Sequence, residues 1–315
     1  LKSEFMGLAV MLELPLVIVD VQRGGPSTGL PTKTEQADLA LALHGRHGES
    51  PIPVIAAQSP ADCLDAAYEA CALAVKYRHP VILLTDGYLG NGSEPMQIPN
   101  LDAVPPIHPN FTTQPNAVNG KGEPAFHPYR RDPETLARPW AVPGTPGLQH
   151  RLGGLEKQDG SGAISHDPAN HDRMTRLRVQ KVARMVADVP DLAVEDPTGD
   201  ADLLMLGWGS SYGPIKAACR NLREQGVKVA QAHLRYLNPL PANTAEVLRR
   251  YRRVVVPEMN LGQLARHLRA EFLVDVVSVT SVRGLPFAVP ELMHLINQHV
   301  DDLNLGHEVA EEVSE

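Results

Sequence analysis

The chain has 315 residues, of which 43% are hydrophobic and 4% are aromatic, and 29 basic against 37 acidic residues leave a net charge of −8. This acidic balance argues against a nucleic-acid binder, which normally carries a basic patch or stripe. No apolar run approaches the roughly 20 residues that cross a bilayer, and the length suffices for two α/β domains.

The first 110 residues are predicted to form one α/β unit. The chain opens at Leu1 rather than Met, in what looks like mid-helix sequence, so we expect a missing N-terminus. A β-branched run at 16–21 is typical of a strand buried on both faces. A helix that begins at Ser59 separates two further strands and is expected to bury one face, and the alternation indicates a parallel sheet. The expected strands lie at 54–57 and 81–84, and the expected buried face of the helix consists of Leu64, Tyr68, Cys71 and Val75.

Residues 111–198 are predicted to form a proline-rich connection followed by a helix. Twelve prolines fall within residues 95–146, which show little periodicity. Helical spacing returns at 173–189. We therefore expect a long connecting segment without a core of its own.

Residues 199–300 are predicted to form a second, smaller parallel-sheet domain. Gly226 and Asn260 are placed to cap two of its helices. Residues 301–315 contain six acids and no Lys or Arg, which predicts a frayed tail. The expected strands of this domain lie at 203–206, 227–232, 254–256 and 276–282, and the helices at 214–225 and 261–272.

The cysteines are few and unpaired. No CxxC pair occurs, so this chain alone is not expected to assemble a zinc site or an iron–sulfur cluster. Sparse thiols fit a reducing cytosol, and we expect a cytoplasmic protein whose thiols are small buried groups. The three positions are Cys63, Cys71 and Cys219.

The strongest local motif is the glycine-rich loop at 22–32, directly behind the first predicted strand. Ligands bind at such strand ends in open α/β sheets. Arg23 is suited to a bidentate pair with a carboxylate, and Thr32 adds a hydroxyl donor. The alternative is a tight turn in which Arg23 pairs with Asp20 or Glu35.

A second glycine turn, at 207–213, stands between a strand and a helix. It suggests a dinucleotide fingerprint and hence a nicotinamide-dependent oxidoreductase. Such a site also requires an acid at the end of the next strand, and residues 230–233 contain none. A structural turn or a domain-contact loop is the other interpretation.

The stretch at 44–49 contains His44, Arg46, His47 and the carboxylate of Glu49, with glycines at 45 and 48. It is interpreted as a flexible polar loop, as a contact for a substrate carboxylate, or as a pair of metal ligands on a poor scaffold. We expect no metal site in this chain. A thiamine-type magnesium motif is also missing, because Asp86 and Asn91 are far too close together.

Taken together, several segments resemble the alpha subunit of 2-oxoacid:ferredoxin oxidoreductases. They occur in the family's order over nearly the whole chain. The arginine–glycine loop and the histidine stretch are most similar to the 2-oxoglutarate branch. The segments are 1–4, 19–29, 45–49, 206–210, 258–263 and 284–287.

This resemblance implies a fold and a reaction. Residues 1–110 would form part of a pyrimidine-type thiamine domain, and residues 199–300 a domain similar to the C-terminal domain of transketolase. The reaction would convert a 2-oxoacid, coenzyme A and oxidised ferredoxin into acyl-CoA, carbon dioxide and reduced ferredoxin. A beta subunit would hold thiamine diphosphate, Mg²⁺ and an iron–sulfur cluster. Arg23 and Thr32 match substrate-binding positions.

The resemblance also implies what this chain lacks. In the family, the glutamate that activates thiamine lies before the segment at 1–4, so the catalytic acid is expected upstream of residue 1 and the fragment alone is expected to be inactive. His44, Arg46 and His47 would recognise a distal carboxylate and so select 2-oxoglutarate over pyruvate. A non-enzymatic alternative is an assembly module without a site of its own.

Overall fold

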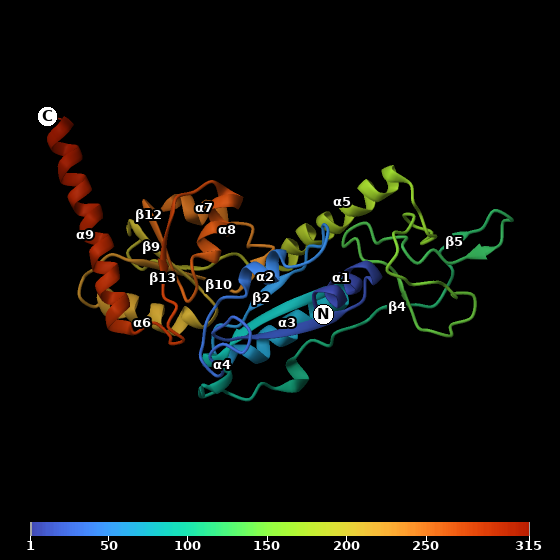
Figure 1. Cartoon of the computed structure of the whole chain (residues 1–315), viewed down its shortest axis with the longest axis horizontal. Coiled ribbons are helices and arrows are strands. Elements are labelled where there is room, and N and C mark those ends of the chain that lie inside the picture. The colour runs from blue at the N-terminus through green and yellow to red at the C-terminus, as the bar shows by residue number, and fades with distance from the viewer. Residues whose placement is uncertain (1, 315) are drawn as a thin grey trace.

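The computed structural model describes the backbone of residues 2–314 and the side chains of residues 3–303. Two mainly parallel sheets lie side by side, so the expected α/β class is confirmed. In Figure 1 the first sheet lies in the centre, the second on the left, and the connection on the right. No helix in the described part of the chain is both long and apolar enough to span a membrane.

The first sheet has the strand order β1-β3-β2-β11, with the last strand antiparallel to its neighbour. β11 comes from the second half of the sequence, so both halves build this sheet. The elements of the first half are α1 (Lys2–Leu12), β1 (Leu16–Gln22), α2 (Leu39–His44), β2 (Val54–Ala56), α3 (Asp62–Tyr77), β3 (Pro80–Asp86) and α4 (Gly87–Asn91), and the added strand is β11 (Tyr236–Asn238).

The position of β1 corrects one prediction. It lies at the edge of the sheet, and Val19 and Val21 are each 55% exposed. The prediction of burial on both faces is therefore wrong. β-branched composition favours a strand but does not distinguish a central position from an edge.

The buried face of α3 also differs from the expectation. Its alanines and Leu73 pack on the sheet, where small side chains allow close approach. The four residues predicted to be buried lie on other sides of the helix, and the Tyr68 hydroxyl donates to the carbonyl of Pro105 at 2.5 Å. Leu64 and Cys71 are exposed, so the expectation of buried thiols holds only for Cys219. The predicted start is nearly right, because Ser59 Oγ accepts from the Asp62 N–H.

The second sheet has the order β13-β12-β9-β10-β8, with only β8 antiparallel. One face packs on α6 and α9, and the other contributes to a core that continues into the first sheet. Every predicted strand is present, although the second begins three residues late. The elements are β8 (Val194–Glu195), β9 (Leu203–Trp208), η3 (Gly209–Ser211), α6 (Tyr212–Arg223), β10 (Ala230–Leu234), α7 (Thr244–Arg250), β12 (Arg253–Glu258), α8 (Gln263–Phe272), β13 (Val276–Thr280) and α9 (Val289–Ser314).

The predicted caps are present and the predicted tail is not. Asn260 Oδ1 accepts from the N–H groups of Gly262 and Gln263 at the start of α8. Gly226 has a φ of +87° just beyond α6, a conformation that suits glycine. The acidic segment at 301–314 continues α9, so the expectation of a frayed tail is wrong for the backbone described.

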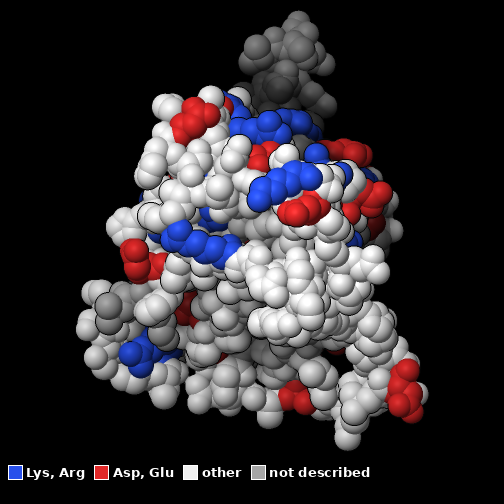
Figure 2. All heavy atoms as spheres, turned by 90° about the vertical axis from the view of Figure 1, so that its right-hand side faces the viewer, with Lys and Arg blue, Asp and Glu red and all other residues white. Residues whose placement is uncertain are grey.

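The connection contains only short elements, as its prolines predict. Figure 2 faces this end of the molecule and shows large uncharged areas with scattered Lys and Arg side chains. Apolar residues of the connection such as Phe111 and Val118 are exposed. The elements are η1 (Leu101–Ala103), β4 (Phe111–Thr112), β5 (Ala117–Val118), β6 (Pro124–Ala125) and β7 (Trp140–Ala141), followed by α5 (Pro168–Arg184) and η2 (Met185–Asp188).

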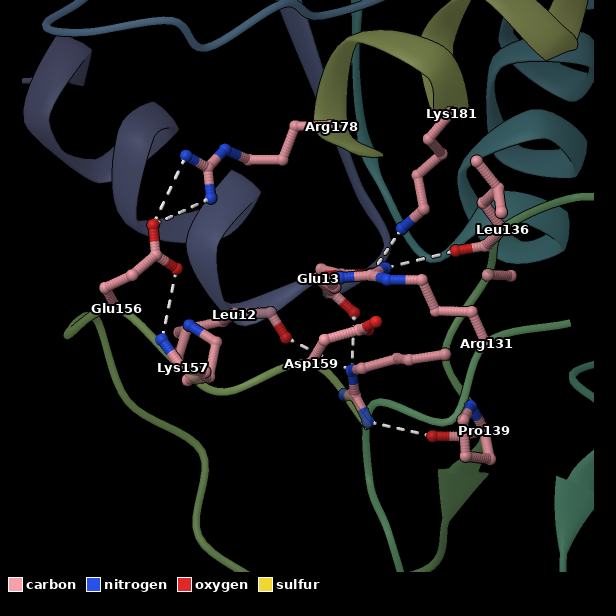
Figure 3. A network of polar contacts seen from close by, with 12 residues as sticks. Leu12, Glu13, Arg131, Leu136, Pro139, Glu156, Lys157, Asp159, Arg178 and Lys181 are labelled. Atoms are coloured by element: carbon pink, nitrogen blue, oxygen red, sulfur yellow. Dashed lines mark hydrogen bonds and ion pairs between the residues drawn. The ribbon is translucent and has the colours of Figure 1, made fainter. Parts of the chain in front are cut away.

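Buried charges fasten the connection to the first sheet (Figure 3). The carboxylate of Glu13, just after α1, accepts hydrogen bonds from both terminal nitrogens of Arg131, at 2.5 and 2.6 Å. It also accepts a hydrogen bond from the ammonium of Lys181 in α5. Burial alone would raise the pKa of Glu13, but the charges of Lys181 and Arg131 outweigh it and hold this pKa well below its usual range. Burial lowers the pKa of Lys181 to about 8. One carboxylate thus joins three distant segments.

Candidate functional site

The Arg23 loop (residues 23–33) is a compact, exposed excursion behind β1. Its base is closed by the Gly24 N–H donating to the Lys33 carbonyl at 2.9 Å and by the Leu30 N–H donating to the Gly24 carbonyl at 2.8 Å. Gly29 has a φ of +50°, and a Cβ there would lie 1.9 Å from the Gly24 oxygen. Only glycine fits this position, so the loop has a defined shape despite its exposure.

Arg23 and Thr32 lie on this loop, and both are exposed. Among the residues whose side chains are described, Arg23 forms no hydrogen bond or ion pair. The alternative in which it pairs with Glu35 is therefore not seen. Its guanidinium is available to an incoming anion at the carboxyl end of the sheet.

Segments from both halves of the chain support this loop. Gln22 at the end of β1 donates to the Thr85 carbonyl at 3.2 Å and accepts from the Asp38 N–H at 3.1 Å. A Cβ on Gly284 would lie 2.9 Å from Lys33 Cβ. The segment that contains Gly284 thus packs directly against the base of the Arg23 loop.

Gln36 is a buried polar link between the two halves. It is fully buried and takes part in four hydrogen bonds. Its side chain donates to the Trp208 carbonyl at 2.7 Å and accepts from the Met259 N–H at 3.0 Å. Its backbone N–H donates to the Met259 carbonyl, and its carbonyl accepts from Asn260. These bonds fix the chain just after the Arg23 loop.

The glycine turn at 207–213 serves as a contact between the two halves. Ser210 donates to the carboxylate of Asp86 at the end of β3, which also accepts from the N–H groups of Tyr88 and Leu89 at 2.9 and 3.0 Å. Burial raises the pKa of Asp86 despite these donors. A Cβ on Gly209 would lie 2.9 Å from Gln36 Nε2. This arrangement matches the predicted domain-contact loop.

The segment at 258–263 has a similar structural role. Glu258 is fully buried and accepts from the N–H groups of Leu264 and Ala265 at 2.8 and 3.0 Å and from Asn260 at 2.9 Å. Burial raises its pKa. The carboxylate therefore anchors the start of α8 and is enclosed away from any ligand.

No described contact joins the histidine stretch to the Arg23 loop. Arg46 donates to the carbonyls of Ala42, Leu43 and Ser50 at 2.7 to 2.8 Å, so its guanidinium terminates α2. His47 lies 3.9 Å from Glu4 and is 90% exposed beside a cavity of about 510 Å³. His44 is exposed and lies edge-on to His267, with ring centroids 6.4 Å apart.

Comparison with known proteins identifies the family. A family model described as pyruvate flavodoxin/ferredoxin oxidoreductase, thiamine diphosphate-binding, matches residues 1–165, which is more than half of the chain. The chain belongs to this family. A second model, pyruvate:ferredoxin oxidoreductase core domain II, matches residues 201–286. The resemblance inferred from the sequence is confirmed.

Relatives from several organisms agree with the family. The 2-oxoglutarate oxidoreductase subunit KorA of Mycobacterium tuberculosis is 62% identical over 94% of this chain and 44% of its own length. The 2-oxoglutarate synthase subunit KorA of Methanocaldococcus jannaschii is 33% identical, with 84% and 68% covered. This chain thus spans less than half of the first of these relatives.

A solved structure shares the fold. The 2-oxoglutarate:ferredoxin oxidoreductase from Magnetococcus marinus, with 2-oxoglutarate, coenzyme A and succinyl-CoA bound, has a TM-score of 0.86 and 36% identity. The match covers 95% of this chain and 51% of that one. The arrangement of both sheets is therefore that of a known family member.

The residues present do not fit the diphosphate end of the family's cofactor. Within residues 3–303, no group of three or more His, Cys, Asp or Glu is arranged to hold a metal ion. Asp86, the acid at the end of β3, is committed to Ser210 and two backbone N–H groups. We therefore derive no step through thiamine diphosphate in this chain.

Local sequence patterns did not predict two groups of residues that join distant segments of the chain. Gln36 has no local motif, because its partners lie about 170 to 220 positions away. The charges around Glu13 come from three segments and are equally invisible to local patterns. The family segments at 206–210 and 258–263 are the only sequence signal that pointed to this junction, since both contact Gln36.

Proposed function

We propose that this chain is part of the alpha subunit of a 2-oxoglutarate:ferredoxin oxidoreductase and that it binds the substrate carboxylate. The reaction converts 2-oxoglutarate, coenzyme A and oxidised ferredoxin into succinyl-CoA, carbon dioxide and reduced ferredoxin. The observation that carries the proposal is the 62% identity over 94% of this chain to a KorA subunit. The bound 2-oxoglutarate and coenzyme A in the Magnetococcus marinus relative support the same substrates.

Arg23 is the proposed substrate clamp. It is an exposed cation without a described partner, on a loop whose shape Gly29 and Gln22 define. A guanidinium accepts a carboxylate through two parallel charge-assisted hydrogen bonds, which fix both the position and the orientation of a 2-oxoacid. The Thr32 hydroxyl on the same loop is proposed as an additional donor.

Recognition of a second carboxylate is proposed for the stretch at 44–49. Arg46 is engaged with three carbonyl groups, whereas the rings of His44 and His47 are exposed. The two histidines are therefore better placed than Arg46 to contact the distal carboxylate of 2-oxoglutarate. Arg46 would instead hold the end of α2 in position.

The proposed assembly is cytoplasmic and contains a beta subunit. That subunit would hold thiamine diphosphate, Mg²⁺ and the iron–sulfur cluster that passes electrons to ferredoxin, since this chain's described residues provide none of these sites. The nicotinamide alternative has little support, because the turn at 207–213 contacts Gln36 and Asp86 instead of facing a ligand.

The test is a substrate comparison on the complete subunit with its partner. Ferredoxin reduction is followed with 2-oxoglutarate or pyruvate, and reactions without coenzyme A serve as the control. We expect kcat/KM to favour 2-oxoglutarate by at least about tenfold, because one unmatched carboxylate leaves a recognition group unpaired. Equal or better use of pyruvate would contradict the substrate assignment. Absence of any 2-oxoacid-dependent reduction would favour the assembly-module alternative.

A further inference from the structure

A large basic cavity lies away from the Arg23 loop, between α3 and the connection. Its volume is about 730 Å³, within the usual range for small-molecule sites. Tyr68 and Val75, on the side of α3 that does not pack on the sheet, form one wall. Arg78, Arg130 and Arg138 line the other parts.

The hydrogen bonds of these three guanidinium groups go only to backbone oxygens, and Arg78 and Arg138 also lie over the aromatic rings of Trp140 and Tyr129. Arg78 donates to the Pro109 carbonyl and Arg130 to the Asn116 carbonyl. Arg138 donates to the carbonyls of Leu12, Glu13 and Pro139 at 3.0 to 3.2 Å. None of the three forms an ion pair in the described part of the chain. Carbonyl groups satisfy hydrogen bonds but leave the positive charges uncompensated.

Two of the arginines are buried and keep unused donors. Arg138 is 2% exposed and Arg78 is 6% exposed. The Nη2 of Arg138 and the Nε of Arg78 are buried without a hydrogen-bond partner within the described residues. Burial and the nearby charge of Arg138 both lower the pKa of Arg78. Buried like charges with unused donors are unfavourable unless an anion joins them.

The remaining charged groups at the cavity offset only part of this positive charge. Arg131 is paired with Glu13, and Lys76 is paired with Asp188 at 2.6 Å. These two ion pairs therefore do not change the net charge that the three arginines bring to the cavity. The carboxylate of Asp132 accepts from the backbone of its own turn and from Thr135. Glu134 is exposed. Both acids keep their negative charge, so beside these ion pairs the three arginines face two carboxylates and the lining retains a net positive charge.

We propose that this cavity binds a small molecule that carries phosphoryl groups. Arg78 and Arg138 bind the anion at depth, Arg130 binds it near the mouth, and the α3 wall covers an adjoining less polar part of the ligand. A planar guanidinium group can donate two parallel hydrogen bonds to a pair of phosphate oxygens. Several guanidinium groups together match the charge of a multiply charged phosphoryl anion, whereas a single carboxylate would need only one of them. The proposal does not depend on the Arg23 loop, and coenzyme A, a substrate of the proposed reaction, belongs to the same class of phosphorylated ligands.

The test is calorimetric titration of the full subunit with inorganic phosphate, pyrophosphate and ADP at low ionic strength, repeated at 0.15 M salt. Saturable binding of pyrophosphate or ADP is expected. Tighter binding of ADP would identify a nucleotide-like ligand, whereas equal affinities would show that the phosphoryl groups alone are recognised. Absence of saturable binding up to about 5 mM for all three probes would overturn the proposal.

Variants locate the binding in this cavity. Arg78→Gln and Arg130→Gln are expected to weaken it at least about tenfold, because each removes a charge-assisted contact. The control is Arg176→Gln, an exposed arginine of α5 that pairs with Asp172. Arg130 is exposed, so its variant is expected to fold even where a buried variant fails. Unchanged affinity in folded Arg130→Gln and Arg78→Gln would also overturn the proposal.

Discussion

Replacing Glu13 with Gln removes the single carboxylate that joins α1, α5 and the connection. The shape of the side chain is retained, but the ammonium of Lys181 and the guanidinium of Arg131 lose their ion-pair partner inside the protein. Both basic side chains are nearly inaccessible, with 2% and 7% exposure. The variant therefore isolates the effect of an unpaired buried charge.

The expected loss of unfolding free energy is about 3–5 kcal/mol, the usual result of removing one partner of a buried ion pair. At roughly 2 °C per kcal/mol, the melting temperature falls by about 6–10 °C. Because Lys181 and Arg131 hold the pKa of Glu13 below its usual value despite burial, its contribution is complete above pH 4.5 and is lost as the pH falls further. The variant lacks this acid-dependent component.

The assay is urea denaturation of the full chain at pH 7, followed by circular dichroism. Glu195→Gln is the matched control, because Glu195 pairs with Arg223 while half exposed and is expected to contribute less than about 1 kcal/mol. Replacing the triad with apolar residues (Glu13→Met, Arg131→Leu, Lys181→Met) should be more stable than Glu13→Gln. A loss below about 1 kcal/mol in Glu13→Gln would refute this reasoning.

Three further predictions concern the junction, the loop and acid stability. Gln36→Leu should lower the free energy of unfolding, measured by urea denaturation, by about 2–5 kcal/mol, since two buried backbone groups lose their partners. The exposed control Gln180→Leu should change this free energy by less than about 0.5 kcal/mol. Equal effects of the two variants would contradict the role of Gln36. Gly29→Ala should lower kcat/KM for the 2-oxoacid at least about tenfold through the backbone clash, and Gly25→Ala, which meets no atom within 4 Å, should not. Burial lowers the pKa of His79 to about 3, so the folded protein holds this ring neutral while the unfolded chain protonates it below about pH 6.5. The free energy of unfolding should therefore fall by about 2 kcal/mol between pH 6.5 and pH 5. A His79→Gln variant whose stability depends on pH in the same way would contradict this prediction.

Local sequence patterns predicted most of the elements. The β-branched and aliphatic runs at 81–84, 203–206 and 254–256 all form strands, and Asn260 caps α8 as expected. These features depend on hydrogen bonds and side-chain preferences within a few residues, which the sequence contains directly.

The errors arise where distant segments decide the packing. Tyr68 and Val75 of α3 face the cavity beside the connection, whereas its alanines and Leu73 pack on the sheet, and hydrophobic spacing alone did not rank the two faces. β1 lies at an edge, and β11 completes the first sheet from the second half. In the candidate site, Arg23 was found from its motif, whereas Gln36 depends on contacts far along the chain.

The most direct test of the central claim is the effect of Arg23 on 2-oxoglutarate turnover by the complete enzyme. Loss of a charge-assisted pair worth about 1.5–3 kcal/mol predicts that Arg23→Gln lowers kcat/KM by roughly 10- to 150-fold. Lys33→Gln removes a charge from the same loop and should have little effect. A change of less than about threefold in Arg23→Gln, or an equal change in both variants, would contradict the proposed carboxylate clamp.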